Sequence, residues 1–146
     1  MTLRIAGLAG SLGNPSRTRA LVALAAARAA ARFGATATTY DLTDLQPSLG
    51  QATRQEDLAA LPAAILETIL SADALIVGSP VYKGSYTGLF KHLFDLIDPA
   101  ALAGKPVLLT ATGGGDKHAL IIEHQLRPLF GFFEAATLPT GIYAGA

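Results

Sequence analysis

The stretch that decides the fold reads Ala9-Gly10-Ser11-Leu12-Gly13-Asn14-Pro15-Ser16-Arg17-Thr18. It follows an apolar run and opens a long helical pattern, which predicts a strand, a short polar loop and a helix start. The loop offers the hydroxyls of Ser11, Ser16 and Thr18 and the guanidinium of Arg17. Because the first turn of a helix also has unpaired N–H groups and a positive dipole end, we expect an anion here. The alternative is an ordinary helix cap at Ser11 or Asn14.

Two further loops follow apolar runs that are typical of buried parallel strands. The first comes directly after Ala74 to Gly78 and contains an aromatic ring, an ammonium group and hydroxyls, in Ser79-Pro80-Val81-Tyr82-Lys83-Gly84-Ser85-Tyr86-Thr87-Gly88. The second, Thr112-Gly113-Gly114-Gly115, follows the run from Pro106 to Thr110. In a parallel sheet all three loops lie at one edge, so an anion site and a site for a flat ring can belong to one ligand.

Together these loops resemble the NADPH-dependent FMN reductase family, which has the flavodoxin-like fold. The resemblance is carried by Gly10-Ser11, Ser16-Arg17-Thr18, Ser79-Pro80-Val81-Tyr82-Lys83, Tyr86-Thr87-Gly88, and Thr112-Gly113-Gly114 with His118. It runs from Leu3 to about Tyr143. The spacing is most similar to the branch of alkanesulfonate and methanesulfonate utilisation, whose members supply reduced FMN to a partner monooxygenase.

The resemblance implies that the first loop holds the FMN phosphate, the second lies along the isoalloxazine ring and the third contacts the polar edge of that ring. The FMN-binding residues that it implies are Ser11, Ser16, Arg17, Thr18, Pro80, Val81, Tyr82, Lys83, Ser85, Thr112, Gly113, Gly114, Gly115 and His118. Many relatives have an arginine where this chain has Gly13, which leaves Arg17 as the cation expected near the phosphate.

Hydride transfer from NADPH or NADH to a flavin requires two flat rings in contact and no catalytic acid or base. Lys83 and the N–H groups of 112–115 are candidates for stabilising the charge of the reduced ring. The simpler interpretation makes Lys83 a solvated loop lysine, and Tyr82 and Tyr86 packing residues. Within the motif we favour ligand contact for Tyr82.

Composition favours one small enzyme domain over residues 1–146. Eleven basic residues balance 11 acidic ones, which argues against a nucleic-acid or anionic membrane surface. No cysteine is present, so redox chemistry requires a bound cofactor. The start has no secretory pattern and no apolar run approaches the ~20 residues that span a bilayer, which predicts a cytoplasmic protein.

Strand and helix patterns alternate along the chain, which predicts an α/β fold with a doubly wound, five-stranded parallel sheet and helices on both faces. Expected strands are Leu3 to Ala9, Ala35 to Tyr40, Ala74 to Gly78, Pro106 to Ala111 and Ala136 to Tyr143. Expected helices are Ser16 to Arg32, Glu56 to Ser71, Tyr86 to Ile97 and Lys117 to Glu134, with a surface loop over Leu45 to Gln55.

A helix normally follows the fifth strand of this fold, yet the sequence stops at Ala146. Either the chain is part of a longer product that supplies its C-terminal helix, or another subunit covers that face. The apolar helix positions Phe90, Phe94, Phe130 and Phe133 exceed what one small sheet is expected to bury. With the family resemblance they predict a homodimer or homotetramer.

The histidines do not have metal-ligand spacing, because His118 and His124 are six residues apart, so no metal is expected. His92 lies among apolar residues and is expected to be structural or at a subunit contact. The stretch Leu126-Arg127-Pro128 resembles the family's fourth-helix motif. The sulfonate-linked branch has an aromatic insertion, tyrosine or histidine, that forces a π-bulge at its tetramer interface. His124 matches that insertion, and a regular helical histidine is the alternative.

Two functions from other classes remain. A nicotinamide-only Rossmann domain is disfavoured because Gly7, Gly10 and Gly13 give G-x-x-G-x-x-G, and because Asp41 lies too far from them. A flavodoxin-like FMN-binding electron carrier, or a quinone- or azo-type reductase with tightly bound FMN, would have the same loops. A serine hydrolase is excluded because the G-x-S-x-G motif is absent.

Overall fold

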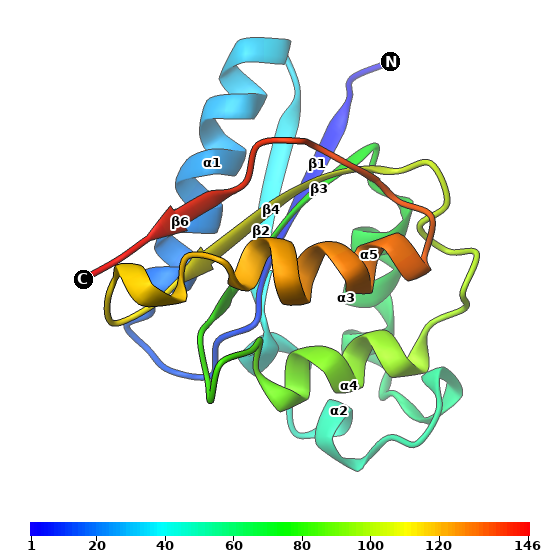
Figure 1. The fold of residues 1–146 in the computed structure, drawn as a ribbon. Coiled ribbons are helices and arrows are strands. Elements are labelled where there is room, and N and C mark those ends of the chain that lie inside the picture. Colours follow the sequence, from blue (N-terminus) through cyan, green and yellow to red (C-terminus); the bar gives the residue numbers. More distant parts are fainter.

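The sheet is parallel throughout, and the computed structural model describes all of residues 1–146 (Figure 1). Its strands are β1 (Arg4–Ala9), β2 (Thr36–Asp41), β3 (Ala74–Pro80), β4 (Pro106–Thr112), β5 (Ala136–Thr137) and β6 (Ile142–Ala144). They lie in the order β2-β1-β3-β4-β5. β6 also pairs with β4, on the same side as β5 but farther along the strand. The chain therefore reverses its winding direction between β1 and β3, where open α/β sheets bind ligands.

The last strand differs from its prediction because it consists of two short pieces. β5 pairs with Pro106 and Val107, whereas β6 pairs with the far end of β4, from Thr110 to Thr112. Between them stands Pro139, which has no N–H group to donate to the sheet. The fifth position of the sheet is thus filled by two strands in line.

The helices are α1 (Arg17–Phe33), α2 (Ser48–Gln51), α3 (Ala60–Ser71), α4 (Gly88–Leu96) and α5 (Arg127–Phe132). Short 3-10 helices cover Leu42–Leu45, Gln55–Asp57 and Asp116–His118, and a π-helix covers Ile122–Leu126. None of the helices is long and apolar enough to cross a membrane.

Ser16 is the N-cap of α1, since its hydroxyl accepts a hydrogen bond from the N–H of Arg19. The alternative of a helix cap at Ser11 or Asn14 is therefore wrong, and Pro15 directly precedes the cap residue. The helix ends at Gly34, whose φ of 64° is the left-handed conformation that favours glycine.

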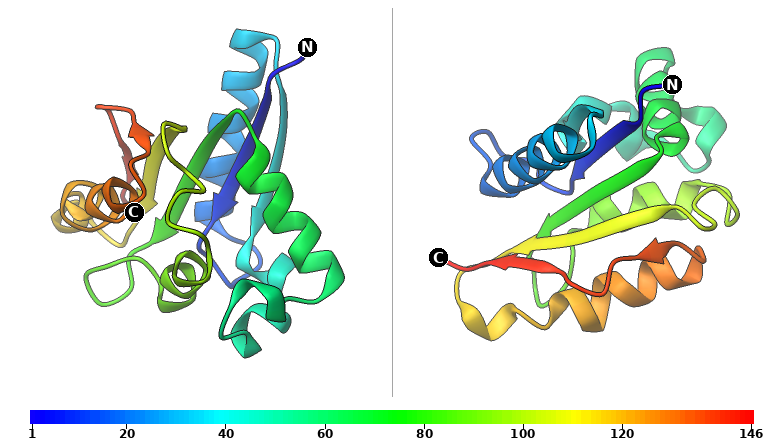
Figure 2. Two further views of the ribbon diagram at one scale, coloured as in Figure 1. Left: turned by 90° about the vertical axis from the view of Figure 1, so that its right-hand side faces the viewer. Right: turned by 90° about the horizontal axis from the view of Figure 1, so that it is seen from above.

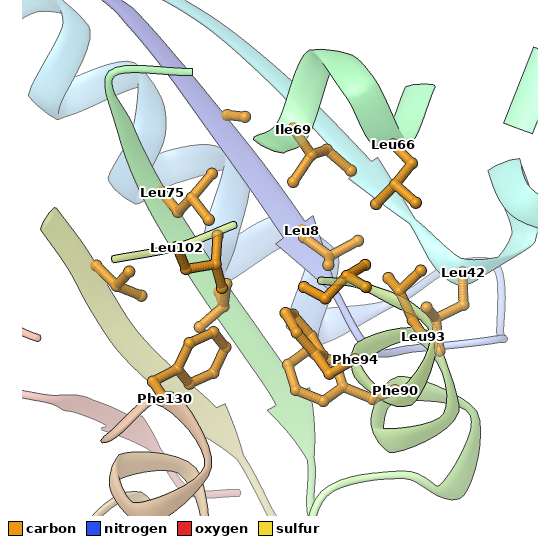
Figure 3. Close-up of a cluster of buried hydrophobic side chains, with 14 of the residues drawn as sticks. Leu8, Leu42, Leu66, Ile69, Leu75, Phe90, Leu93, Phe94, Leu102 and Phe130 are labelled. Carbon is orange, nitrogen blue, oxygen red and sulfur yellow. The ribbon is translucent and has the colours of Figure 1, made fainter. Parts of the chain in front are cut away.

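Helices cover both faces of the sheet, and Figure 2 shows α1 and α5 on opposite sides of the strands. On one face Val22 and Ala26 of α1 pack with Ile5, Ala9 and Ile76 of the strands. The other face carries a cluster of 26 buried residues, of which Figure 3 shows the part around Leu8, Leu75 and Phe130. This larger core joins α3, α4 and α5 to the sheet.

Three expected segments differ from the structure. The helix expected from Lys117 to Glu134 is divided into a 3-10 helix, the π-helix and α5. The expected surface loop over Leu45 to Gln55 contains α2 and the end of a 3-10 helix, and Leu45 and Leu49 are fully buried. Such short helices contain too few residues to show a period in the sequence. The helix expected from Glu56 begins at Ala60, which places Pro62 in its first turn, where its missing N–H donor breaks no helical hydrogen bond.

The four phenylalanines that were expected to exceed what one small sheet can bury are all buried within the chain. Phe90, Phe94, Phe130 and Phe133 are each at most 5% exposed. The ring centroids of Phe90 and Phe94 are 4.8 Å apart, and those of Phe94 and Phe130 are 5.1 Å apart. The rings of α4 and of the helical segment after β4 thus fill the core by packing on one another (Figure 3). Their apolar character gives no argument for assembly.

Candidate functional site

The predicted loops after β1, β3 and β4 meet at one edge of the sheet and line a cavity of about 340 Å³. The lining residues are Ser11, Gly13, Pro15, Ser16, Arg17, Thr18, Pro80, Val81, Tyr82, Thr112, Gly113 and Gly114. All of the predicted FMN-binding residues are among them except Lys83, Ser85, Gly115 and His118. Arg17 is the one charged side chain in this lining.

Hydrogen bonds tie the three loops to one another. The Thr87 hydroxyl, at the N-cap of α4, donates to the carbonyl of Gly10 at 2.7 Å. The N–H of Val81 donates to the carbonyl of Thr112 at 2.9 Å. The hydroxyls of Thr18 and Thr112 are 2.7 Å apart, and both residues are buried. The cavity is therefore a preformed part of the fold.

One end of the cavity is suited to a phosphate. The Ser16 hydroxyl donates to Oγ of the buried Ser11 at 2.8 Å. The N–H groups of the loop residues 11–14 donate no hydrogen bond within the chain. Arg17 is exposed at the start of α1, and its guanidinium donates to the carbonyl of Gly145 at 3.0 Å. Free N–H groups, hydroxyls and one guanidinium at a helix N-terminus form the donor set that phosphates prefer.

A charged cluster at the end of β2 fixes the beginning of α1. The Arg19 guanidinium lies 2.8 Å from a carboxylate oxygen of Asp41 and 3.0 Å from one of Asp44, and it also donates to the carbonyl of Thr39. Burial acts to raise the pKa of Asp41, but hydrogen bonds from Thr43 and Arg19 outweigh it and hold that pKa below its ordinary value. Asp41 therefore stays ionised and anchors the helix that carries the phosphate donors.

The lining also contains a less polar segment, Pro80, Val81 and Tyr82. Tyr82 is 53% exposed, which leaves its ring accessible from solvent. In the third loop, a Cβ placed on Gly114 would meet no atom within 4 Å. Position 10 requires glycine for a different reason, because a Cβ there would lie 2.6 Å from the ring of Phe90. Gly114 thus leaves room for a ligand to approach the backbone closely, whereas Gly10 is needed for the backbone to pack on Phe90.

The four predicted residues outside the cavity lie near it. Lys83 has a φ of 52° and is exposed in the turn after Tyr82. Ser85 closes that turn, and its hydroxyl donates to Oε1 of Gln125 at 3.0 Å. Gly115 directly follows the lining residues of the third loop, and His118 lines a neighbouring cavity. Gln125, which sequence reasoning missed, connects the second loop to the π-helix.

Tyr143 is the second residue that the sequence did not indicate. Its hydroxyl donates to the carbonyl of Gly115, and a Cβ on Gly113 would lie 2.2 Å from the Tyr143 oxygen. The N–H of Gly113 also donates to the carbonyl of Ala144. β6 therefore holds the third loop in place. A tyrosine near the end of the last predicted strand was the available signal, but its partner could not be inferred from sequence.

We expect Tyr143→Phe to weaken the binding of FMN and of riboflavin by the same factor, about three- to fivefold, because one hydrogen bond contributes about 1 kcal/mol. The lost bond holds the loop at the ring end of the cavity, so the phosphate has no part in the effect. Fluorescence titration with both flavins measures it. Equal affinities in the variant and the parent would show that Tyr143 does not position this loop.

Two histidines have defined surroundings. Nε2 of His92 lies 3.1 Å from the carbonyl of Leu49 and 3.0 Å from that of Ala52, so its role is structural, as predicted. His124 lies in the π-helix, where the N–H of Arg127 donates to the carbonyl of Ile122, five residues earlier. The predicted π-bulge is therefore confirmed. π-Helical segments are frequently found at functional sites.

The sequence model of the NADPH-dependent FMN reductases matches residues 3–146. This chain belongs to that family. Curated relatives include an NADH-dependent FMN reductase SfnF of Pseudomonas fluorescens, which is 49% identical over 97% of this chain and 76% of its own length. An FMN reductase (NADPH) of Pseudomonas aeruginosa is 48% identical over the same shares of the two chains.

Solved structures agree with the family. An oxidoreductase from Corynebacterium diphtheriae superposes with a TM-score of 0.90 at 33% identity, covering 99% of this chain and 82% of that one. The apo form of the NADH:FMN oxidoreductase EmoB gives a TM-score of 0.89 at 32% identity, covering 98% of this chain and 76% of that one. The chain is thus a flavin reductase, for which FMN and NAD(P)H are the expected cofactors.

Proposed function

We propose that the chain reduces FMN with NAD(P)H and releases the reduced flavin to a monooxygenase of sulfonate metabolism. The observation that carries the proposal is one cavity whose lining combines hydroxyls and the guanidinium of Arg17 with the less polar Pro80, Val81 and Tyr82. The position of His124 in a π-helix supports the sulfonate-linked branch. Exposure of both Arg17 and Tyr82 suits a flavin that enters and leaves.

Each part of the cavity has a proposed role. Bound FMN supplies the hydride-accepting ring of the reaction. Ser11, Ser16, Arg17 and Thr18 hold its phosphate and so fix the distance from the first loop to the ring. Pro80, Val81 and Tyr82 support one face of that ring, and Thr112 with the adjacent glycines lies along its edge. No side chain of this lining is required to transfer a proton.

The third loop is proposed to bind the polar edge of the ring through its backbone N–H groups. Gly114 leaves room for close approach, and Tyr143 keeps the neighbouring peptide groups oriented. Lys83 stands in a turn beside Tyr82, outside the cavity lining. We propose that it attracts the negatively charged flavin by its field, with the backbone groups making the direct contacts.

Two measurements test the function. A visible spectrum of freshly purified protein shows whether flavin is retained, and NAD(P)H oxidation with excess free FMN measures turnover. A flavin reductase oxidises the nucleotide continuously as FMN is added. An electron carrier binds flavin but oxidises nicotinamide negligibly, and an azo- or quinone-type reductase retains its flavin and requires a dye or quinone as acceptor. Either of those results would contradict the proposed function.

We also propose a homodimer or homotetramer, with the groove between α4 and α5 at the contact. This groove is lined by Phe94, Ile97, Pro99, Leu129, Phe132 and Phe133, together with the Lys91–Asp95 ion pair. Phe132 is 68% exposed at its rim. A large exposed ring beside an apolar groove suits a second copy of the same chain, which carries both the ring and the groove.

We therefore expect Phe132→Asp to give a smaller particle than the parent at micromolar concentration, because a carboxylate would have to enter the apolar groove. Light scattering measures the mass of both proteins, and circular dichroism checks the fold. Leu24→Asp, at an exposed position of α1 on the other side of the sheet, is the control. A parent that is monomeric, or a variant with the parental mass, would count against this contact.

A further inference from the structure

A second cavity, of about 240 Å³, lies next to the flavin cavity, between the loop after β3 and the segment that leads into the π-helix. The two cavities share Val81, which lines both. Apolar contacts inside the second one come from Val81, Leu120 and Ile121. Its basic side chains are Lys117, His118 and His124, and Gln125 adds an amide group. A lining that combines apolar and basic side chains is suited to a nucleotide, which combines a flat base with phosphate groups.

The charge around this cavity is positive because no carboxylate lines it. The neighbouring Glu123 is occupied by Arg127, whose guanidinium donates to both of its carboxylate oxygens, at 2.7 and 2.8 Å. Asp116 points toward the C-terminal segment, where its Oδ1 lies 3.0 Å from a Cβ placed on Gly145. Lys117 is exposed and has no ion-pair partner. Its ammonium is therefore available to an anion.

The position of the cavity indicates which anion this is. The FMN phosphate is proposed at Arg17, at the other end of the flavin cavity. A nicotinamide that donates a hydride must stack on the flavin ring, beside Val81 and Tyr82. The rest of the dinucleotide then has to extend from the ring on a side that the FMN phosphate does not occupy, and the second cavity opens there, across Val81.

We propose that this cavity binds a phosphate group of the nicotinamide dinucleotide, with Lys117 as its main charged contact and His118 and His124 as further donors. The inference rests on the proposed function. It also bears on cofactor choice, since the two Pseudomonas relatives differ in naming NADH and NADPH. The group bound is either the 2′-phosphate, which only NADPH has, or the diphosphate bridge, which both nucleotides have.

The test is Lys117→Ala, compared with Arg28→Ala as a matched control. Arg28 is an exposed cation on α1 that lines neither cavity. Because the contact is at the surface, we expect the KM for the nucleotide to rise about fivefold in Lys117→Ala, and the Kd for FMN to stay at the parental value. A rise for NADPH alone assigns the 2′-phosphate, and a rise for both nucleotides assigns the diphosphate. Unchanged KM values for both overturn the proposal.

Binding of adenosine 2′,5′-bisphosphate and of AMP, measured by calorimetry on the purified protein, gives a readout that does not depend on turnover. The proposal requires that Lys117→Ala weaken at least the bisphosphate, while Arg28→Ala does not. If the parent oxidises no NAD(P)H but this difference is found, the proposed function fails and the nucleotide subsite stands. If the parent turns over and Lys117→Ala binds and reacts as the parent does, only the subsite fails.

Discussion

Arg17→Ala should weaken FMN binding about tenfold and leave riboflavin binding unchanged. A charge-assisted hydrogen bond to a phosphate contributes about 1.5 to 3 kcal/mol, and the lower part of that range applies here because the guanidinium is exposed. Arg17 is the one charged side chain lining the cavity, so no second cation replaces it. Riboflavin lacks the phosphate and loses nothing. Fluorescence quenching titrations with the two flavins measure the difference.

Two further variants separate charge from structure. Arg17→Lys should recover part of the affinity, because an ammonium keeps the charge and loses the fork of donors. Arg28→Ala removes a cation elsewhere on α1 and should change neither affinity. Arg17 also contacts the carbonyl of Gly145, so its loss releases the C-terminal segment from the first loop. If that release were the main effect, FMN and riboflavin would weaken together, and the phosphate would have to lie elsewhere.

The meeting of the three loops around one cavity could be predicted from sequence because parallel strands end at a common edge. The polar residues after β1, β3 and β4 were separated by tens of residues, yet the fold brings Ser11, Val81 and Thr112 into one lining. Contacts that depend on side-chain direction could not be predicted. Lys83 stands outside the cavity because its turn, with a positive φ, presents it to solvent. Tyr143 reaches the third loop only because Pro139 interrupts the last strand and β6 then pairs with the end of β4.

The core shows the same limit. The helical spacing of Phe90, Phe94 and Phe130 indicated apolar helix faces correctly. The pattern of one helix, however, does not show which other element packs against its apolar face. These rings meet across two helical segments, with Phe90 and Phe130 centroids 6.4 Å apart, and are all buried within the chain. Leu45 and Leu49 were missed for the opposite reason, because their turns are too short to have a period.

Deletion of His124 should give a yellow protein that retains FMN and no longer reduces free flavin. The π-helix accommodates one extra residue between Ile122 and Leu126, which are both buried. Removing His124 shortens their spacing from four residues to three, and both spacings keep two side chains on one helical face. The core can therefore tolerate a regular helix. Gln125, which follows the deleted residue, is tied to the second loop by the hydrogen bond from Ser85. The deletion therefore changes how the residues that precede position 124 are placed relative to that loop.

We attribute the exchange of flavin to this insertion. His124 is exposed and lines the second cavity together with Gly84 of the second loop. Without the extra residue, the helix and the second loop should settle around a bound flavin, which then leaves too slowly for turnover. The matched control is His124→Ala, which keeps the chain length and should remain colourless. The loss of its proposed nucleotide contact should raise only the KM for NAD(P)H. A deletion variant that is colourless and reduces free FMN at the parental rate would show that the π-helix does not control release.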